Sequence, residues 1–271
     1  CKNFGVDCYQ NAHSIWRNNL ALHAFRRILD QSKGRVFQIV LGGAGDPIKH
    51  EDFKEILYLT RKAGIVSNLT TTGFELTDNE AVCMGEHCGA VAVSFYSRLD
   101  KNLNETSNVP FDAVDSLLKA GCSVNIYFVL SKRTIRDAIF RLNNKRFPAG
   151  ISSVIFLLYK AVGEGRECDV LDIQGNDYLA FLDLVQNNDF DFSIGFDTCQ
   201  TPYIRKNCKK VWNGSIEACE SGRFSMYIDC DFSAHPCSFS TSNKEFRVDL
   251  NSFSIEDAGN SYQFESFRHK Q

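Results

Sequence analysis

The sequence predicts an α/β fold, either a parallel barrel or a doubly wound sheet, followed by a small second domain. Short β-branched or apolar runs alternate with longer amphipathic stretches, which is the pattern of consecutive βα units. Several of the runs are apolar on both faces, as strands of a covered parallel sheet must be. A single series of such units favours one parallel sheet.

Each element of the series can be placed in order. The six predicted strands cover residues 36–41, 66–70, 90–95, 124–130, 153–159 and 190–196. Helices are predicted over residues 11–31, 51–63, 78–86, 111–120, 135–143 and 177–186. The glycines at positions 64, 121 and 150 stand just before the next strand and are typical helix stop signals.

The pattern changes after residue 196. The chain becomes irregular, polar and rich in cysteine, and residues 223–229 and 235–239 form two short segments typical of a hairpin. We therefore expect two domains, covering residues 1–198 and 199–271.

Composition excludes several classes of function. The chain has 271 residues, 44% of them hydrophobic, which is ample for a core. Its net charge of −3 and its dispersed basic residues argue against nucleic acid or an anionic membrane as a partner. Neither an apolar run of about 18 residues nor a signal-peptide pattern is present, so we expect a cytoplasmic protein.

Eleven cysteines are many for such a chain. A disulfide framework is disfavoured because such frameworks belong mostly to short exported domains without a large core. Reduced thiols can instead bind soft metals as thiolates. We expect metal ligation by at least four cysteines, and buried or inert thiols at Cys83, Cys88, Cys122 and Cys168.

The first predicted strand runs directly into Gly42-Gly43-Ala44-Gly45-Asp46-Pro47, called here the glycine loop. Loops at the carboxyl ends of parallel strands bind ligands, and glycines let the backbone approach a ligand closely. Asp46 adds a carboxylate that can accept from an ammonium group. The loop has neither the dinucleotide spacing nor the Lys-Ser/Thr ending of a phosphate loop.

Together with the start of the chain, this loop resembles the radical S-adenosylmethionine (SAM) enzymes. Their signature, Cys-x-x-x-Cys-x-x-Cys before an aromatic residue, follows the first barrel strand. Cys1, Gly5, Cys8 and Tyr9 have its spacing, and Gly42, Gly43, Asp46 and Pro47 resemble the second-strand motif that holds the SAM amino group. Gly5 replaces the middle thiolate. Either the signature begins upstream of Cys1, or the middle ligand is replaced. The sequence lacks the barrel strand expected before Cys1, which favours a truncated N-terminus.

The resemblance implies a partial (β/α)6 TIM-type barrel and further cofactor contacts. Thr71 would belong to the polar tip of the second predicted strand, Ser94 would end the third, and Asn125 would lie with Tyr127 on the strand that usually contacts the ribose. Tyr9 would be the aromatic residue of the signature. The alternative to a cofactor contact is that Ser94 and Asn125 are ordinary hydrogen-bonded polar residues.

The C-terminal part resembles the SPASM or Twitch auxiliary-cluster domain of peptide-modifying members of that family. Cys219 and Cys237 bracket the predicted hairpin, and the ending Pro-Cys-Ser-Phe is typical of that domain. The resemblance makes Cys199 the third ligand of an auxiliary cluster, with Cys208 as its competitor, and Cys230 a nonligand. Phe232 stands where the family usually has a turn glycine. We expect the fourth ligand beyond the end of this chain.

The resemblance implies two [4Fe-4S] clusters and S-adenosylmethionine as cofactors. Reductive cleavage of S-adenosylmethionine would give a 5′-deoxyadenosyl radical. This radical would abstract a hydrogen atom from a ribosomally made precursor peptide, for example to form a thioether or another crosslink. The sequences of several predicted strands resemble those of maturases of Cys-rich repeat peptides. An electron donor such as flavodoxin or ferredoxin would be a partner. Two alternatives stay open: a noncatalytic iron–sulfur or peptide-binding protein on the same scaffold, and a zinc protein that uses Cys219 and Cys237.

Overall fold

The structure is a computed structural model, and it describes residues 8–12, 17–210, 214 and 216–270. Six strands form one parallel sheet in the order β1-β2-β3-β4-β5-β6. They are β1 (Gln38–Leu41), β2 (Val66–Thr71), β3 (Cys88–Ser94), β4 (Val124–Leu130), β5 (Ser153–Leu158) and β6 (Ser193–Phe196). The helices between them are α2 (Phe53–Lys62), α3 (Asp78–His87), α4 (Val109–Lys119), α5 (Ile135–Asn143) and α6 (Asn176–Asn187).

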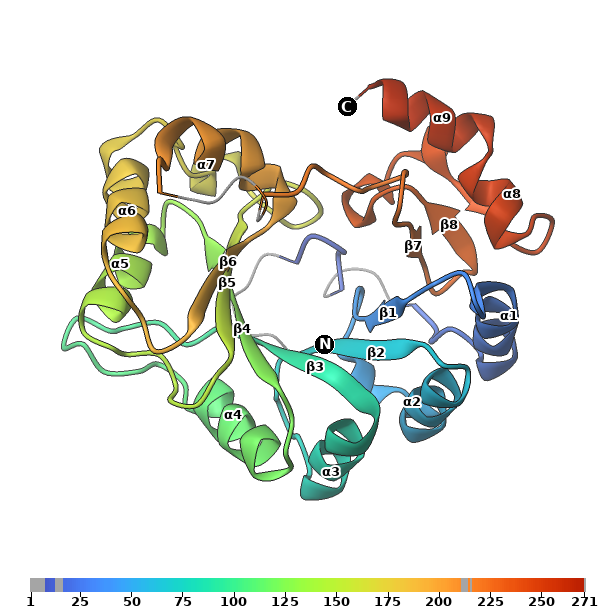
Figure 1. Cartoon of the computed structure of the whole chain (residues 1–271), viewed down its shortest axis with the longest axis horizontal. Coiled ribbons are helices and arrows are strands. Elements are labelled where there is room, and N and C mark those ends of the chain that lie inside the picture. Colours follow the sequence, from blue (N-terminus) through green and yellow to red (C-terminus); the bar gives the residue numbers. More distant parts are fainter. Residues whose placement is uncertain (1–7, 13–16, 211–213, 215, 271) are drawn as a thin grey trace.

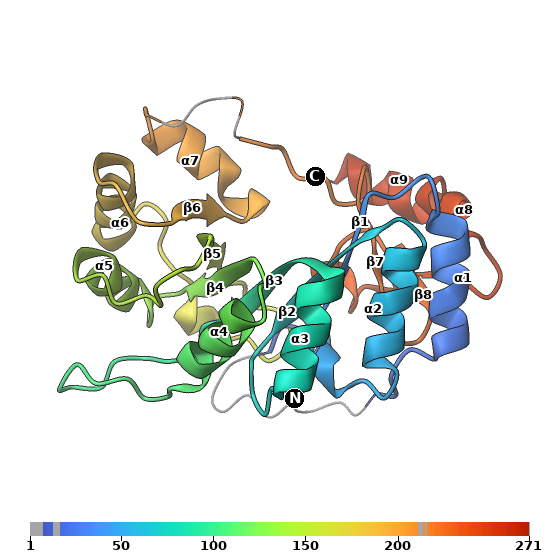
Figure 2. The same cartoon turned by 60° about the horizontal axis from the view of Figure 1, so that its bottom comes forward.

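The sheet curves into an open, partial barrel with these helices on its convex side (Figure 1). Its strands follow one another in sequence order without the reversal that defines a doubly wound sheet. The barrel alternative is therefore correct. The loop between β3 and α4 extends away from the body of the molecule (Figure 2).

Alternation along β4 is typical of how the strands are packed. Its residues alternate between buried and half-buried positions from Val124 to Leu130. Val124, Ile126, Phe128 and Leu130 enter a continuous apolar cluster with the strands and helices around them, while the side chains between them face the other side of the sheet. β4 thus carries one face into the apolar cluster and the other to the opposite side of the sheet.

Helix α1 (Leu22–Ser32) is shorter than the helix predicted over residues 11–31. Asn18 and Asn19 are exposed and nonhelical, in keeping with the tendency of asparagine to hydrogen-bond locally outside helices. The His50 ring is bonded to the carbonyl oxygen of Leu20 at 2.9 Å, which holds the chain just before the helix. The part of the prediction on residues 13–16 lies outside the described residues.

Strand β6 begins at Ser193, three residues later than predicted. Phe190 and Phe192 stack with their ring centroids 5.8 Å apart and pack against the barrel core from the preceding loop. Aromatic residues in this stretch look like a strand in the sequence, but here they serve packing.

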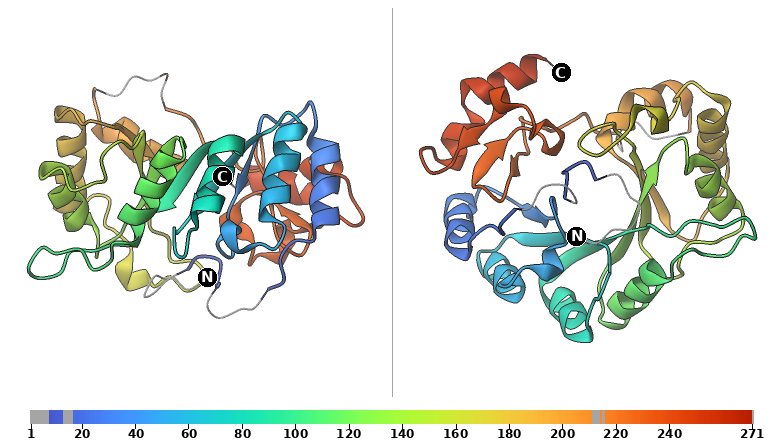
Figure 3. Two further views of the ribbon diagram at one scale, coloured as in Figure 1. Left: turned by 90° about the horizontal axis from the view of Figure 1, so that it is seen from below. Right: turned by 180° about the vertical axis from the view of Figure 1, so that it is seen from behind.

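The C-terminal part adds α7 (Thr201–Asn207), a small antiparallel sheet, and two short helices. The sheet has the order β7-β8-β9, with β7 (Tyr227–Ile228), β8 (Ser233–His235) and β9 (Val248–Asp249), and it is followed by α8 (Ile255–Gly259) and α9 (Tyr262–His269). We call residues 219–270 the C-terminal module. Figure 3 shows this module beside α1.

The predicted hairpin exists with shorter strands than expected. Tyr227 pairs with His235 and Ile228 pairs with Ala234, so the segments 223–226 and 236–239 lie outside the ladder. The turn contains Phe232 with a φ of +58°, a conformation that is rare for a bulky residue. Phe232 is nevertheless buried, and the Arg27 guanidinium lies 5.0 Å from its ring centroid, which compensates for the strained backbone.

The buried clusters do not divide the chain at residue 198. Ile204 and Cys208 belong to the barrel core, so α7 packs with the barrel. Conversely, Phe25 and Ile28 of α1 share a second cluster with Ala234 and Phe264 of the module. The module therefore completes its core with the first helix of the chain. The domain boundary at residue 198 stays a prediction.

Within the described ranges, none of the helices combines the length and the apolar character needed to span a membrane.

Candidate functional site

A cavity of about 1660 Å³ occupies the concave side of the barrel. Its lining comes from three sources: the ends of the strands, the N-terminal segment that begins at Cys8, and the C-terminal module. In Figure 1 the dark blue segment lies inside the arc of the sheet, across from the module. The cavity therefore gathers parts of the chain that are far apart in sequence.

The glycine loop forms one edge of this cavity, and Gly42, Gly43, Asp46 and Pro47 all line it. Pro47 begins a short 3-10 turn, and Asp46 caps it through the Ile48 amide, which donates at 3.4 Å. Gly43 has a φ of +105°, which only glycine adopts without strain. The loop thus has the exposed, tightly turned backbone that the sequence predicts.

Asp46 joins the glycine loop to the tip of β2. Its Oδ2 accepts from the Thr71 hydroxyl at 3.0 Å, the Thr72 amide at 2.7 Å and the Thr72 hydroxyl at 2.7 Å. Charge-assisted bonds of this kind are among the stronger hydrogen bonds in proteins. Asp46 therefore fixes two neighbouring strand ends as one surface, and the expected bond to a ligand ammonium stays a prediction. Thr71 is bound into this network and also lines the cavity.

Tyr227 of the module packs directly on the glycine loop. A methyl group built on Gly43 would lie 2.6 Å from the Tyr227 hydroxyl oxygen. That hydroxyl donates to Asp229 at 3.4 Å, and Asp229 pairs with Arg17 at 3.0 Å. Burial and the nearby Asp229 carboxylate raise the pKa of Tyr227. The module, the loop and the segment before α1 are thereby held against one another.

The N-terminal segment is also bound to both sides of the cavity. The Cys8 amide donates to Glu164 at 3.3 Å, and the Tyr9 ring lies 4.7 Å from the Phe239 ring. The buried Gln10 side chain donates to the Ser238 carbonyl at 2.7 Å. Cys8 and Tyr9 line the cavity, whereas Cys1 and Gly5 lie outside the described residues.

Two tyrosines lie in the cavity wall on neighbouring strand segments: Tyr96 follows the end of β3, and Tyr127 is the middle residue of β4. Tyr96 interacts through its hydroxyl with Ser94, and burial raises its pKa to about 12. Tyr127 interacts in the same way with Thr70, and burial raises its pKa as well. Ser94 and both tyrosines line the cavity, which supplies hydroxyl groups next to the loop.

The prediction for Asn125 needs a correction. Asn125 is the second residue of β4, at the amino-terminal end of the strand, and it does not line the cavity in the described part of the chain. Its amide oxygen accepts from the Ser153 hydroxyl at 2.7 Å. Ligands bind at the carboxyl ends of parallel strands, and Tyr127, two residues further along in the middle of β4, lines the cavity instead.

Three of the distal cysteines, Cys199, Cys219 and Cys237, line the same cavity. Cys199 follows β6 in a turn that Gln200 holds by donating to the Phe156 carbonyl at 2.6 Å and to Asp197 at 2.8 Å. Cys199 and Cys219 are close enough to interact electrostatically. Cys237 follows β8 and is close enough to Tyr9 to interact with it electrostatically.

The other cysteines have different surroundings. Cys208 is buried in the barrel core and does not line the cavity, so the structure does not bring it to the other three. Cys230 lines the cavity, and burial raises its pKa to about 11. Among the cysteines expected to be buried, Cys83, Cys88 and Cys122 pack against the core, but Cys168 is exposed.

The thiols are not arranged for a single ion. A group of three potential metal ligands would need Cys, His, Asp or Glu residues with all ligand atoms within 4.8 Å of one another. Among the residues that the structure places, the group that meets this condition is His50, Glu51 and Asp52, and it contains no cysteine. The ligands of one tetrahedral zinc ion must be in mutual contact. An iron–sulfur cluster instead binds each thiolate through a different iron, so wider spacing suits it.

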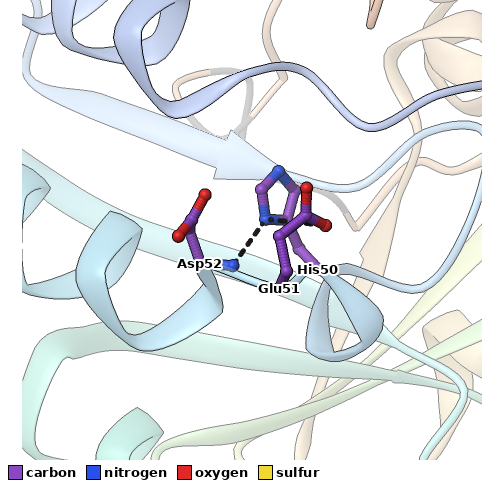
Figure 4. Close-up of side chains that lie close together, drawn as sticks. All are labelled: His50, Glu51 and Asp52. Atoms are coloured by element: carbon purple, nitrogen blue, oxygen red, sulfur yellow. Dashed lines mark hydrogen bonds and ion pairs between the residues drawn. The ribbon is translucent and has the colours of Figure 1, made fainter.

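Figure 4 shows why the His50 group is structural. The Asp52 amide donates to His50 Nδ1 at 3.0 Å, and His50 Nε2 is bonded to the Leu20 carbonyl at 2.9 Å. The first bond uses the lone pair of Nδ1, so Nε2 carries the proton and donates it. Neither ring nitrogen is left to bind a metal.

The sequence did not predict several of the lining residues, among them Arg17, Tyr96, Lys160, Asp197 and Tyr227. Lys160 follows β5, and its Nζ donates to Asp197 Oδ2 at 2.8 Å. Both residues stand directly after parallel strands, which is the one signal that could have identified them. Tyr96 has the same signal, because it stands two residues after the end of β3, whereas Arg17 does not follow a strand.

No protein-family model matches the sequence, and neither does any curated protein sequence. Solved structures do match the fold. One is SuiB of Streptococcus suis bound to the precursor peptide SuiA, with a TM-score of 0.71 and 16% identity over 96% of this chain. The chain spans 62% of the length of SuiB.

A second similar structure is anSMEcpe with bound AdoMet and the Kp18Cys peptide. It matches with a TM-score of 0.69 and 16% identity over 97% of this chain and 79% of anSMEcpe. A further structure of native anSMEcpe with bound AdoMet has a TM-score of 0.67, over 96% of this chain and 78% of that one. The chain therefore has the fold of SuiB and anSMEcpe, a partial parallel barrel followed by a small antiparallel sheet.

Proposed function

We propose that the chain is a radical SAM enzyme that modifies a ribosomally made peptide. The observation that carries this proposal is the shared cavity, because Cys8, the glycine loop and the three cysteines Cys199, Cys219 and Cys237 all line it. Solved structures of the same fold were obtained with AdoMet and with peptides. The sequence motifs and the fold thus support one activity.

The glycine loop would hold the methionine end of S-adenosylmethionine. Gly42 leaves the backbone of the loop exposed, and Asp46 keeps the loop and the β2 tip in one position through its bonds to Thr71 and Thr72. Ser94 would offer a further polar contact beside Tyr96. A [4Fe-4S] cluster bound through Cys1 and Cys8, the two cysteines that this chain has on the signature spacing, would supply the electron for reductive cleavage of SAM.

A second [4Fe-4S] cluster would be held by Cys199, Cys219 and Cys237. The donor set fits, because all three thiols line one cavity and their spacing is unlike that of a single-ion site. Thiolate ligands suit iron–sulfur clusters. The module carries Cys219 and Cys237 while the barrel carries Cys199, so the cluster would join the two.

The size of the cavity supports a peptide substrate. Sites for small molecules have volumes of roughly 300–1,000 Å³, whereas this cavity has about 1660 Å³. The space beyond that of a small-molecule site suits a peptide segment. We infer that the reaction forms a thioether or another crosslink in this peptide. Flavodoxin or ferredoxin would supply electrons, and the many cysteines of the chain suit the reducing cytoplasm.

Anaerobic reconstitution with iron, sulfide, S-adenosylmethionine and dithionite tests the proposal. We expect 5′-deoxyadenosine from the chain, loss of at least 90% of it in Cys8→Ala, and unchanged yield in the control Cys168→Ala, whose cysteine is exposed and does not line the cavity. Clusters without any 5′-deoxyadenosine would contradict the enzymatic proposal and favour a noncatalytic iron–sulfur protein.

A further inference from the structure

Lys160 occupies an unusual position between the barrel and the C-terminal module. Its Nζ donates to Asp197 Oδ2 at 2.8 Å and to the Leu158 carbonyl at 3.2 Å. The same Nζ lies 4.3 Å from the centroid of the Phe239 ring, and only 21% of the side chain is exposed. The ammonium group is thus held in one place by groups from three segments.

Two of these contacts lie next to cysteines of the proposed auxiliary site. Asp197 precedes Cys199 by two residues, and Phe239 follows Cys237 by two residues. Lys160, Asp197, Phe239 and both cysteines line the same cavity. The ammonium therefore stands between the barrel segment and the module segment that carry these thiols. The Lys160 side chain also interacts with the Cys199 thiol, where it opposes the rise in pKa that desolvation causes.

Lys160 and Asp197 place opposite charges beside the thiols. A cluster bound by thiolates gains a negative charge on reduction, so a fixed positive charge or hydrogen-bond donor nearby favours the reduced form. A fixed carboxylate has the opposite effect. Because the two charges are paired at 2.8 Å, removal of either one leaves the other uncompensated next to the site.

We propose that Lys160 is a positioning residue that raises the reduction potential of an auxiliary cluster at Cys199, Cys219 and Cys237, and that Asp197 limits this effect. The inference rests on the proposed function, since it requires a cluster at these thiols. It assigns a role to an ion pair that neither the cysteine motifs nor the glycine loop explains.

A redox titration followed by electron paramagnetic resonance tests the inference. The background is Cys8→Ala, reconstituted with iron and sulfide, so that the auxiliary cluster is observed without the first cluster. We expect Lys160→Met to lower the midpoint potential, Asp197→Asn to raise it, and the double variant to return close to the background value. Lys119→Met is the matched control, because Lys119 pairs with Asp115 at the exposed surface, and we expect no shift from it.

The two proposals fail in different ways. A Cys8→Ala chain that binds no cluster overturns the auxiliary site and this inference with it. A cluster that forms but has the same potential in Lys160→Met as in Lys119→Met overturns the inference alone. Shifts of the same sign in Lys160→Met and Asp197→Asn also contradict it, because a purely structural ion pair would disturb the site similarly from either partner. Lys160→Arg, which keeps the charge, should stay nearer the background potential than Lys160→Met.

Discussion

The two sides of the cavity are built differently. On the barrel side, neighbouring strand ends bind one another, as Asp46 does with Thr71 and Thr72, above a large core of strands and helices. On the module side, the strands are only two or three residues long, and the core is completed by α1. The barrel side therefore has a large core of its own, whereas the module side depends on its contacts with the rest of the chain.

This difference teaches where the site is vulnerable. The module meets the barrel through side chains: Tyr227 on Gly43, Phe239 on Tyr9, and Asp229 on Arg17. Loss of one of these contacts would change how the two sides face each other without unfolding the barrel. Substitutions in each side can test this comparison.

The largest effect is expected from Phe264→Ala. Phe264 is fully buried in the cluster shared by α1 and the module, and truncation of a buried Phe costs about 3–5 kcal/mol. Phe156→Ala, in the barrel core, should cost a similar amount. Urea unfolding followed by near-ultraviolet and far-ultraviolet circular dichroism should show early, separate loss of module structure for Phe264→Ala and one transition for Phe156→Ala. Identical transitions in both variants would contradict the proposed dependence of the module.

A smaller effect is expected from Asp46→Ala. The substitution removes the acceptor of four hydrogen bonds, which costs about 1–3 kcal/mol of stability. It also frees the glycine loop from the β2 tip, so affinity for S-adenosylmethionine should fall at least tenfold. Equilibrium dialysis measures the affinity, with Asp115→Ala at the exposed surface as the control. Unchanged binding in Asp46→Ala would exclude this loop as the binding element.

Arg17→Met should have a weaker effect. The Arg17–Asp229 pair is only 23% and 11% exposed, and removal of Arg17 leaves Asp229 without its cation, at a cost of about 1–2 kcal/mol. Arg26→Met is the matched control, because its pair with Glu55 is 55% and 44% exposed and such pairs contribute about 0–1 kcal/mol. Thermal unfolding should separate the two variants, and equal losses would show that the buried pair does not hold the module.

The smallest effect concerns Asp231 at the turn of the module. Burial opposes its ionisation, but hydrogen bonds from Ser233 and Arg247 outweigh this and lower the pKa of Asp231. A carboxyl whose pKa is lowered by folding stabilises the protein above its unfolded value of about 3.9 and loses that contribution as the pH falls further. Asp231→Asn should therefore cost less than about 1 kcal/mol at pH 7 and nothing near pH 2. Thermal unfolding at both pH values measures this, and a difference that persists at the lower pH would contradict the account.

The barrel could be predicted from the sequence much better than the module. The strand 124–130 and the helix 135–143 have the predicted bounds, because long periodic segments bury one face and expose the other. The module has two-residue strands and 3-10 turns, and its core is completed by Phe25 and Ile28 from the start of the chain, which no local pattern reveals. Phe232 in a left-handed turn goes against local preference and depends on tertiary packing.

The candidate site shows the same limit. Gly42, Gly43, Asp46, Cys8 and Cys237 could be found because each belongs to a motif, and all of them line the cavity. Asn125 could have been placed correctly, because the predicted strand 124–130 already puts it at the amino-terminal end, whereas ligands bind at the carboxyl end. Lys160 and Tyr227 were missed because their roles come from contacts with distant segments.

The central claim is that both sides of the cavity hold a cluster, and iron and sulfide content after anaerobic reconstitution tests it most directly. We expect two clusters, or about eight iron atoms per chain, with about half lost in Cys8→Ala, the other half lost in Cys219→Ala, and no loss in Cys168→Ala. The two single variants should have different electron paramagnetic resonance spectra. A Cys219→Ala chain with undiminished iron, or a colourless protein that binds zinc in place of iron, would contradict the claim.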